Sequence, residues 1–174
     1  QGITVQQCLD FGERAAHQFD IPFIFMTYYN ILFKYGVARF AETTAAKGLK
    51  GAIVPDLPPE EGSEYLDAME THKLAPIFIF APTSSDQRMQ MIAEHARGFV
   101  YCVARKGVTG QQTQFSRQLD AYLARCRQAT DLPLALGFGV KDKADIDFLT
   151  GKADIAVIGT QTIRIVEEQG IEAV

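Results

Sequence analysis

Six short apolar runs alternate with segments of helical character along the chain, and this alternation constrains the fold more than any other feature. The runs occupy residues 22–28, 51–54, 76–80, 99–103, 132–136 and 154–158. Each run reads as a strand, and the run at residues 99–103 reads as a strand buried on both faces. Each run is followed by a segment that reads as a helix. Strict alternation of strand and helix indicates a parallel sheet with helical crossovers, so the predicted fold class is α/β.

The positions of the glycine-rich loops favour a barrel over an open sheet. An open nucleotide-binding sheet carries its glycine fingerprint after the first strand, with an acid about 20 residues on. Here the loop at residues 27–30 has no glycine, and the glycine loops follow the last three runs, at residues 107–110, 137–139 and 159–160. A phosphate site in the final loops is typical of the (β/α)8 barrel, which needs eight units and about 250 residues. Six units in 174 residues therefore leave two possibilities, an open sheet or a barrel lacking two units, and we favour the second.

Length, composition and charge restrict the remaining classes. A chain of 174 residues that is 47% hydrophobic can bury one sizeable core, so residues 1–174 are predicted to form a single domain. A net charge of −4 with scattered Lys and Arg gives no support for nucleic acid or a membrane as a partner. The three cysteines lack CxxC spacing, so we expect free thiols in the cytoplasm and no metal site.

The first helix has a recognisable start. Residues 2–19 read as an amphipathic helix with Thr4 as its N-cap, and we expect Val5, Cys8, Leu9 and Phe11 to face inward.

The segment from Arg97 to Gly110 has the layout of an anion-binding loop. An apolar run is followed by two glycines, Gly107 and Gly110, which enclose Val108 and Thr109 before a helical segment. Glycine allows backbone N–H groups to approach a ligand closely, and a helix start favours anions. An ordinary strand-to-helix turn is the alternative. The two similar loops further along the chain favour a phosphate or carboxylate cradle.

Several motifs, taken together, resemble one family. They are Met-Thr-Tyr-Tyr-Asn at 26–30, Ile-Val-Pro-Asp-Leu-Pro-Pro-Glu-Glu at 53–61, Gly-Phe-Val-Tyr at 98–101, Gly-Val-Thr-Gly at 107–110, Gly-Phe-Gly at 137–139 and Ile-Gly-Thr at 158–160. In this order and spacing they resemble the tryptophan synthase alpha chain over essentially the whole sequence. The resemblance implies a (β/α)8 TIM barrel, of which the third to eighth units are present here and the first two and the extreme C-terminus are not.

The resemblance also implies an activity and a partner. The family is a lyase of tryptophan biosynthesis that cleaves indole-3-glycerol phosphate to indole and glyceraldehyde 3-phosphate. It passes the indole to a β subunit within an α2β2 assembly. Pyridoxal phosphate belongs to that β subunit, so we expect no cofactor in this chain. The family's catalytic Glu and Asp would lie upstream of Gln1. We therefore expect no catalytic residue here, and an inactive 174-residue chain on its own.

The remaining site residues are carried over position by position. The implied phosphate-binding residues are Gly110, Gly139, Gly159 and Thr160, where the family more often has Ser at the last position. The implied substrate-binding residues are Tyr28, Ile53, Ile79, Tyr101, Thr109 and Phe138. The implied contacts with the β subunit are Asn30, Asp56 and Pro58. Ile53 and Ile79 could instead be plain barrel core, the two tyrosines could be core residues with satisfied hydroxyls, and Asp56 could serve as a helix cap.

Two other functions remain open from the sequence. Another phosphate-sugar barrel, such as an isomerase, would need a carboxylate or Cys pair at its strand ends. The visible ends carry only Tyr28, Asp56 and Tyr101. A truncated, non-catalytic module that binds phosphate or the β subunit is the third possibility, and it would bind phosphate without turnover.

Overall fold

The computed structural model describes residues 2–104, 112–137 and 139–173, with the backbone alone at 112–116. The chain divides into two compact units, which are described separately. The first unit runs to Phe78 and includes Glu94–Gly98. The second unit comprises Ile79–Ala93 and the chain from Phe99 onward. The prediction of a single domain is not tested by this division and stays a prediction.

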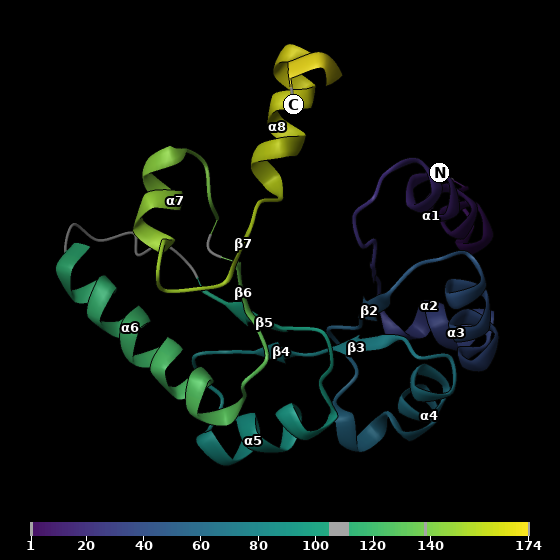
Figure 1. Ribbon diagram of the computed structural model, residues 1–174, viewed down its shortest axis with the longest axis horizontal. Helices are drawn as coiled ribbons and strands as arrows, with labels where there is room; N and C mark the ends of the chain where they lie inside the picture. The colour runs from purple at the N-terminus through teal and green to yellow at the C-terminus, as the bar shows by residue number, and fades with distance from the viewer. Residues whose placement is uncertain (1, 105–111, 138, 174) are drawn as a thin grey trace. The chain divides into compact units, whose positions relative to one another are not determined.

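The first unit is built on a three-stranded parallel sheet (Figure 1). Its elements are α1 (Val5–Gln18), β1 (Phe25–Met26), α2 (Tyr29–Tyr35), α3 (Val37–Ala46), β2 (Gly51–Ile53), the 3-10 helix η1 (Pro59–Glu61), α4 (Ser63–Thr71) and β3 (Ala75–Ile77). The strand order is β1-β2-β3, with Met26 opposite Ile53 and Ile53 opposite Ile77. The helices α3 and α4 pack against each other, and their buried side chains form a core with Leu9, Leu32 and Ala52.

The second unit is built on a four-stranded parallel sheet (Figure 1). Its elements are β4 (Ile79–Phe80), most of α5 (Asp86–His95), β5 (Val100–Val103), α6 (Gln112–Ala129), β6 (Leu134–Gly137), α7 (Lys143–Leu149), β7 (Ile155–Val157), α8 (Thr160–Gln169) and the 3-10 helix η2 (Ile171–Ala173). The strand order is β4-β5-β6-β7. Tyr122 of α6 donates a buried hydrogen bond of 2.8 Å to the carbonyl oxygen of Phe80, which ties helix to sheet.

The predicted alternation of strands and helices is confirmed, with one change in the third strand. The run at residues 76–80 forms two strands, β3 and β4, separated by Phe78 and belonging to different sheets. The division between the two units falls at the same residue. The other five predicted strands each appear once and are one to five residues shorter than predicted. Four of them lie within the predicted range, and β6 extends one residue beyond it, to Gly137.

The predicted N-cap of the first helix is confirmed, but its predicted inward face is partly wrong. Thr4 forms a capping box with Gln7, with a hydrogen bond of 3.2 Å from Gln7 N–H to Thr4 Oγ1. Leu9 is buried, but Phe11 is 65% exposed and Cys8 is also exposed. Each residue advances a helix by about 100°, so Phe11 lies on nearly the opposite side of α1 from Leu9. The four residues predicted to face inward therefore belong to two different faces of the helix.

Within the part of the chain that the structure describes, no helix is long and apolar enough to cross a membrane.

Candidate functional site

A cavity of about 390 Å³ lies in the second unit, where β5, β6 and β7 end. The strands contribute Tyr101, Gly137 and Val157 to its wall. The segments that follow the strands contribute Gly139, Val140, Lys141, Gly159, Thr160, Gln161 and Arg164. The carboxyl ends of parallel strands are where ligands bind in α/β proteins, because the loops and helix starts converge there.

Two glycines leave backbone open toward this cavity. Gly139 has φ of +76°, a conformation that side chains other than glycine rarely adopt. A Cβ atom built on either Gly139 or Gly159 would find no heavy atom within 4 Å. These two positions can therefore bring backbone N–H groups close to a ligand without steric interference.

The start of α8 completes this side of the cavity. Gly159 is the N-cap, and Thr160 and Gln161 are the first two helical residues. The first N–H groups of a helix have no acceptor within the helix and carry the positive end of its dipole. An anion at this point of the cavity would meet these N–H groups and the Thr160 hydroxyl together.

Tyr101 contributes to the cavity wall beside the glycine backbone of β6. Its ring packs directly against Gly137, where an added Cβ would stand 2.8 Å from Tyr101 Cζ. The residue is half-buried, and burial raises the pKa of its phenol above the usual value. The hydroxyl therefore stays protonated at neutral pH and can donate a hydrogen bond.

Lys141 and Arg164, two cationic residues, also line the cavity. Neither of them was predicted from the sequence. Arg164 lies four residues after Thr160 in α8, so the two share one face of the helix. The loop at Lys141 is held by a hydrogen bond of 3.0 Å from its backbone N–H to Asp145 Oδ2. Asp142 in turn caps α7 by accepting a 3.0 Å bond from Asp145 N–H. The residues that line the described cavity include no Asp or Glu, so its charge is positive.

The predicted site residues fall into four groups according to where they lie in the structure. The cavity brings together Tyr101, Gly139, Gly159 and Thr160. Thr109, Gly110 and Phe138 lie outside the described residues. Ile79 begins β4 in the second unit and is half-buried, but it does not line the described cavity.

The other predicted residues belong to the first unit. Ile53 is buried in β2, as a core residue would be, and Tyr28 is 61% exposed at the start of α2. Asp56 Oδ1 accepts a hydrogen bond of 2.9 Å from the Tyr29 backbone N–H, so its carboxylate caps α2. Asn30 lies in the first turn of α2, and Pro58 precedes η1. The roles of all these residues toward substrate or partner stay predictions.

Among the described residues, no three His, Cys, Asp or Glu side chains lie close enough together to hold a metal ion. Cys102 and Cys126 are buried free thiols, and Cys8 is an exposed one.

The fold defines an α/β protein of the barrel class, with a positively charged cavity at the ends of its strands. The sequence model of the tryptophan synthase alpha chain family matches residues 1–173. The chain belongs to this family, as the motifs indicate.

Individual relatives agree with the family assignment. The tryptophan synthase alpha chain of Syntrophotalea carbinolica is 65% identical over 173 residues, covering 99% of this chain and 68% of that protein. The corresponding chain of Desulforapulum autotrophicum is 63% identical with the same coverage. The chain thus spans about two thirds of the length of the curated relatives it matches.

Solved structures confirm the predicted fold. Tryptophan synthase from M. tuberculosis, in an aminoacrylate-bound form, matches with a TM-score of 0.85 and 31% identity, covering 96% of this chain and 63% of that chain. The tryptophan synthase complex from Pyrococcus furiosus matches with a TM-score of 0.84 and 26% identity, covering 99% and 69%. The fold is that of the family's (β/α)8 barrel, of which this chain forms a part.

Proposed function

We propose that this chain is part of the alpha subunit of tryptophan synthase, a lyase that cleaves indole-3-glycerol phosphate to indole and glyceraldehyde 3-phosphate. The observation that carries the proposal is the cavity of the second unit, with open glycine backbone, a helix start and a positive charge where the family motifs predict the phosphate. Membership of the family supports the reaction.

The phosphate would bind at the strand ends of the second unit. Gly139, Gly159 and Thr160 line the cavity and would donate backbone hydrogen bonds. By the family resemblance, Gly110 would complete the set. The Thr160 hydroxyl replaces the more frequent Ser and keeps a donor. Lys141 and Arg164 would balance the charge of a dianion, because a buried or half-buried phosphate is costly without nearby cations.

The rest of the substrate would contact apolar and aromatic side chains. Tyr101 would line the pocket with its ring and keep a protonated hydroxyl available as a donor. Tyr28, Ile53, Ile79 and Phe138 would surround the indole ring, and Thr109 would belong to the loop that closes over the substrate.

The chemistry needs two acid/base groups that this cavity does not supply. In the retro-aldol cleavage, C3 of the indole gains a proton as its bond to the glycerol carbon breaks, and the neighbouring hydroxyl loses its proton to become the aldehyde. Positioned acid/base groups typically contribute about 10²–10⁴-fold each. No carboxylate or imidazole is among the residues lining the described cavity. We therefore expect the 174-residue chain alone to be inactive and the full-length protein to be active.

A β subunit is the expected partner. Asn30, Asp56 and Pro58 would contact it, and pyridoxal phosphate would be bound there and not in this chain. Two of the matching structures are of tryptophan synthase and of a tryptophan synthase complex, which supports an assembly of this kind. Buried free thiols at Cys102 and Cys126 suit a cytoplasmic location.

The test is indole release from indole-3-glycerol phosphate. The full-length protein should form indole and glyceraldehyde 3-phosphate in equal amounts, and the chain Gln1–Val174 should bind glycerol 3-phosphate without forming either. A folded full-length protein that releases no indole, alone or with its β subunit, would refute the proposed reaction. Turnover by the 174-residue chain would refute the assignment of the acid/base pair to residues outside it.

A further inference from the structure

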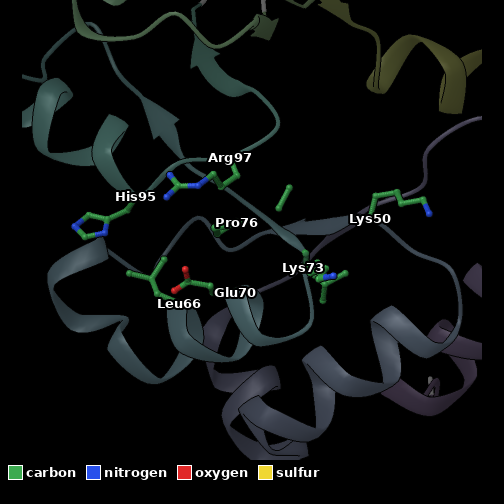
Figure 2. Close-up of a pocket in the computed structure, with 9 residues that line it drawn as sticks. Lys50, Leu66, Glu70, Lys73, Pro76, His95 and Arg97 are labelled. Atoms are coloured by element: carbon green, nitrogen blue, oxygen red, sulfur yellow. The ribbon is translucent and has the colours of Figure 1, made fainter.

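A second cavity, of about 540 Å³, lies in the first unit at the amino ends of its strands (Figure 2). Its polar and charged lining consists of Lys50, Glu70, Lys73, His95 and Arg97. Lys50 immediately precedes β2, and Lys73 comes two residues before β3. Its apolar wall includes Leu66 and Pro76. Three cations and one carboxylate therefore line a hollow large enough for a small molecule.

The cations surround the hollow from different segments. Figure 2 shows Arg97 and His95 on one side, Lys50 on the other and Lys73 between them, with the Lys50 ammonium directed outward. The long side chain of lysine can swing back over the opening, whereas Lys73 and Arg97 already lie at the hollow. An anion would therefore be held mainly by Lys73 and Arg97, with Lys50 closing the rim.

These cations are available to a ligand. Lys47, Lys143 and Lys152 each pair with a carboxylate elsewhere in the chain. Within the described residues, neither Lys50 nor Lys73 has an ion-pair partner, although Glu70 lines the same cavity. Toward the described residues Arg97 uses only Nη1, which donates to the carbonyl oxygens of Glu94 and Ala96 at 3.0 and 2.8 Å. Its Nε and Nη2 donors remain free to bind an oxyanion in the fork geometry typical of arginine.

Lys73 occupies a backbone position that favours glycine. Its φ of +55° makes it the one non-glycine residue with positive φ in the described chain. Lys73 N–H donates to Glu70 O and Leu74 N–H to Met69 O, at 3.0 and 2.8 Å, which is the Schellman ending of α4. Lysine at this position reduces stability relative to glycine, and residues held in such conformations cluster at functional sites. The Lys73 side chain lines the cavity, so this conformation places a cation at its wall.

The backbone under the charged groups is fixed. Lys50 N–H donates to Phe23 O at 2.9 Å, and Lys50 O accepts from Ala75 N–H at 2.9 Å. Arg97 N–H donates to Pro76 O at 3.0 Å. Because these bonds hold the Cα atoms in place, only side-chain freedom is lost when a ligand binds.

We propose that this cavity is a binding site for a small phosphate-type dianion, separate from the site of the second unit. Lys73 and Arg97 would bind its oxygens, and Glu70 would accept a hydrogen bond from a hydroxyl of the ligand or from a protonated phosphate oxygen. The inference does not rest on the proposed function. Free phosphate and a phosphate ester share this chemistry, so the experiment must distinguish them.

The experiment is a ¹H–¹⁵N NMR titration of the full-length protein with inorganic phosphate and, separately, with glycerol 3-phosphate, at constant ionic strength. The backbone amides of Lys73, Ala75 and Arg97 should shift and saturate, independently of those at Gly159 and Thr160. A tighter isotherm with inorganic phosphate identifies the free ion as the ligand, and a tighter one with glycerol 3-phosphate identifies an ester. Shifts that do not saturate with either probe would overturn the proposal.

Variants separate the ligand from the fold. Arg97→Gln should weaken binding in this cavity by about fivefold or more, since it removes one positive charge at the anion. Lys34→Gln, an exposed lysine of α2 in the same unit, is the matched control and should leave the isotherm unchanged.

Lys73→Gly gives two readouts in opposite directions. Relief of the positive φ should raise Tm by roughly 2–4 °C, while loss of the ammonium should weaken phosphate binding by about fivefold or more. A higher Tm with unchanged affinity would show that Lys73 is not a ligand and would overturn the proposal.

Discussion

The ring of Tyr101 lies against the backbone of Gly137, so closely that no side chain fits between the two strands at this point. A Cβ on Gly137 would come within 2.8 Å of Tyr101 Cζ and closer still to the hydroxyl oxygen. Both residues line the cavity of the second unit. The glycine of β6 therefore sets the depth at which the Tyr101 ring sits in the candidate site.

Gly137→Ala should disturb both stability and substrate binding. The added methyl group forces Tyr101 out of its position, and overpacking of this kind typically costs about 1–3 kcal/mol. We expect a lower free energy of unfolding in urea and a higher KM for indole-3-glycerol phosphate.

The double variant with Tyr101→Ala supplies the control for this contact. Once the ring is absent, the alanine at position 137 has no clash, so the two substitutions should cost less together than the sum of their separate effects. If the losses of unfolding free energy in the two single variants were strictly additive in the double variant, the contact between Tyr101 and Gly137 would be contradicted.

Thr160→Ala should weaken binding of glycerol 3-phosphate by roughly 10–100-fold, because a hydrogen bond to a charged group contributes about 1.5–3 kcal/mol. Thr160→Ser keeps the hydroxyl and should bind nearly as well as the wild type. The affinity can be measured by calorimetry. Thr162→Ala, two residues further along α8 and not among the cavity residues, is the control. Equal affinities of the Thr160→Ala variant and the wild type would remove Thr160 from the site.

Protonation of the Asp154 carboxylate should make the second unit less stable in acid. Its Oδ2 accepts a 2.7 Å hydrogen bond from Leu134 N–H at the start of β6, and it pairs with Arg127. The Leu134 N–H, followed by Arg127, lowers the pKa of the Asp154 carboxyl below its ordinary value of 3.8. A carboxyl with a lowered pKa stabilises the fold fully above about pH 3.8, and this contribution is lost as the pH falls through the folded-state pKa.

Asp154→Asn tests this contribution. At neutral pH the variant should be less stable by about 1 kcal/mol, mainly through the weaker bond to Leu134, because the exposed ion pair with Arg127 is screened by solvent. The difference from the wild type in urea unfolding should shrink below pH 4. A difference that stays constant from pH 7 to pH 3 would exclude the charged form as its source.

Asp56 has two predicted roles, and two substitutions separate them. Asp56→Ala removes the acceptor for Tyr29 N–H and should destabilise the start of α2 by about 1 kcal/mol. Asp56→Asn keeps an acceptor, so its Tm should stay close to that of the wild type.

Titration with the β subunit then isolates the interface role. If Asp56 contacts the partner through its charge, Asp56→Asn should lower the affinity although the fold is unchanged. Loss of affinity only in Asp56→Ala would instead make Asp56 a helix cap without a direct contact.

The fold was largely predictable because local patterns determine its elements. Thr4 and Gln7 form the capping box that the N-cap prediction requires, and the six apolar runs all contain strands. The division of the third run at Phe78 was not predictable, because residues 76–80 are apolar throughout and strand pairing depends on neighbours far along the chain. The exposure of Phe11 was missed for a similar reason, since periodicity alone does not decide which of two apolar helix faces is buried.

The site was predictable where backbone chemistry determines it. Gly139, Gly159 and Thr160 were selected from the loops that end the strands, and the structure brings them into one cavity with Tyr101. Arg164 was missed because it lies inside a helix, although its spacing of four residues from Thr160 places it on the same face. The cavity of the first unit gave no sequence signal, because Lys50, Lys73 and Arg97 are far apart in the chain and meet only through the order of the strands.

The most direct test of the account is a crystal structure of the full-length protein with glycerol 3-phosphate. We expect phosphate oxygens at about 2.7–3.2 Å from the backbone nitrogens of Gly159 and Thr160, with Arg164 and Lys141 beside them. A phosphate bound elsewhere, with these amides facing solvent, would contradict it.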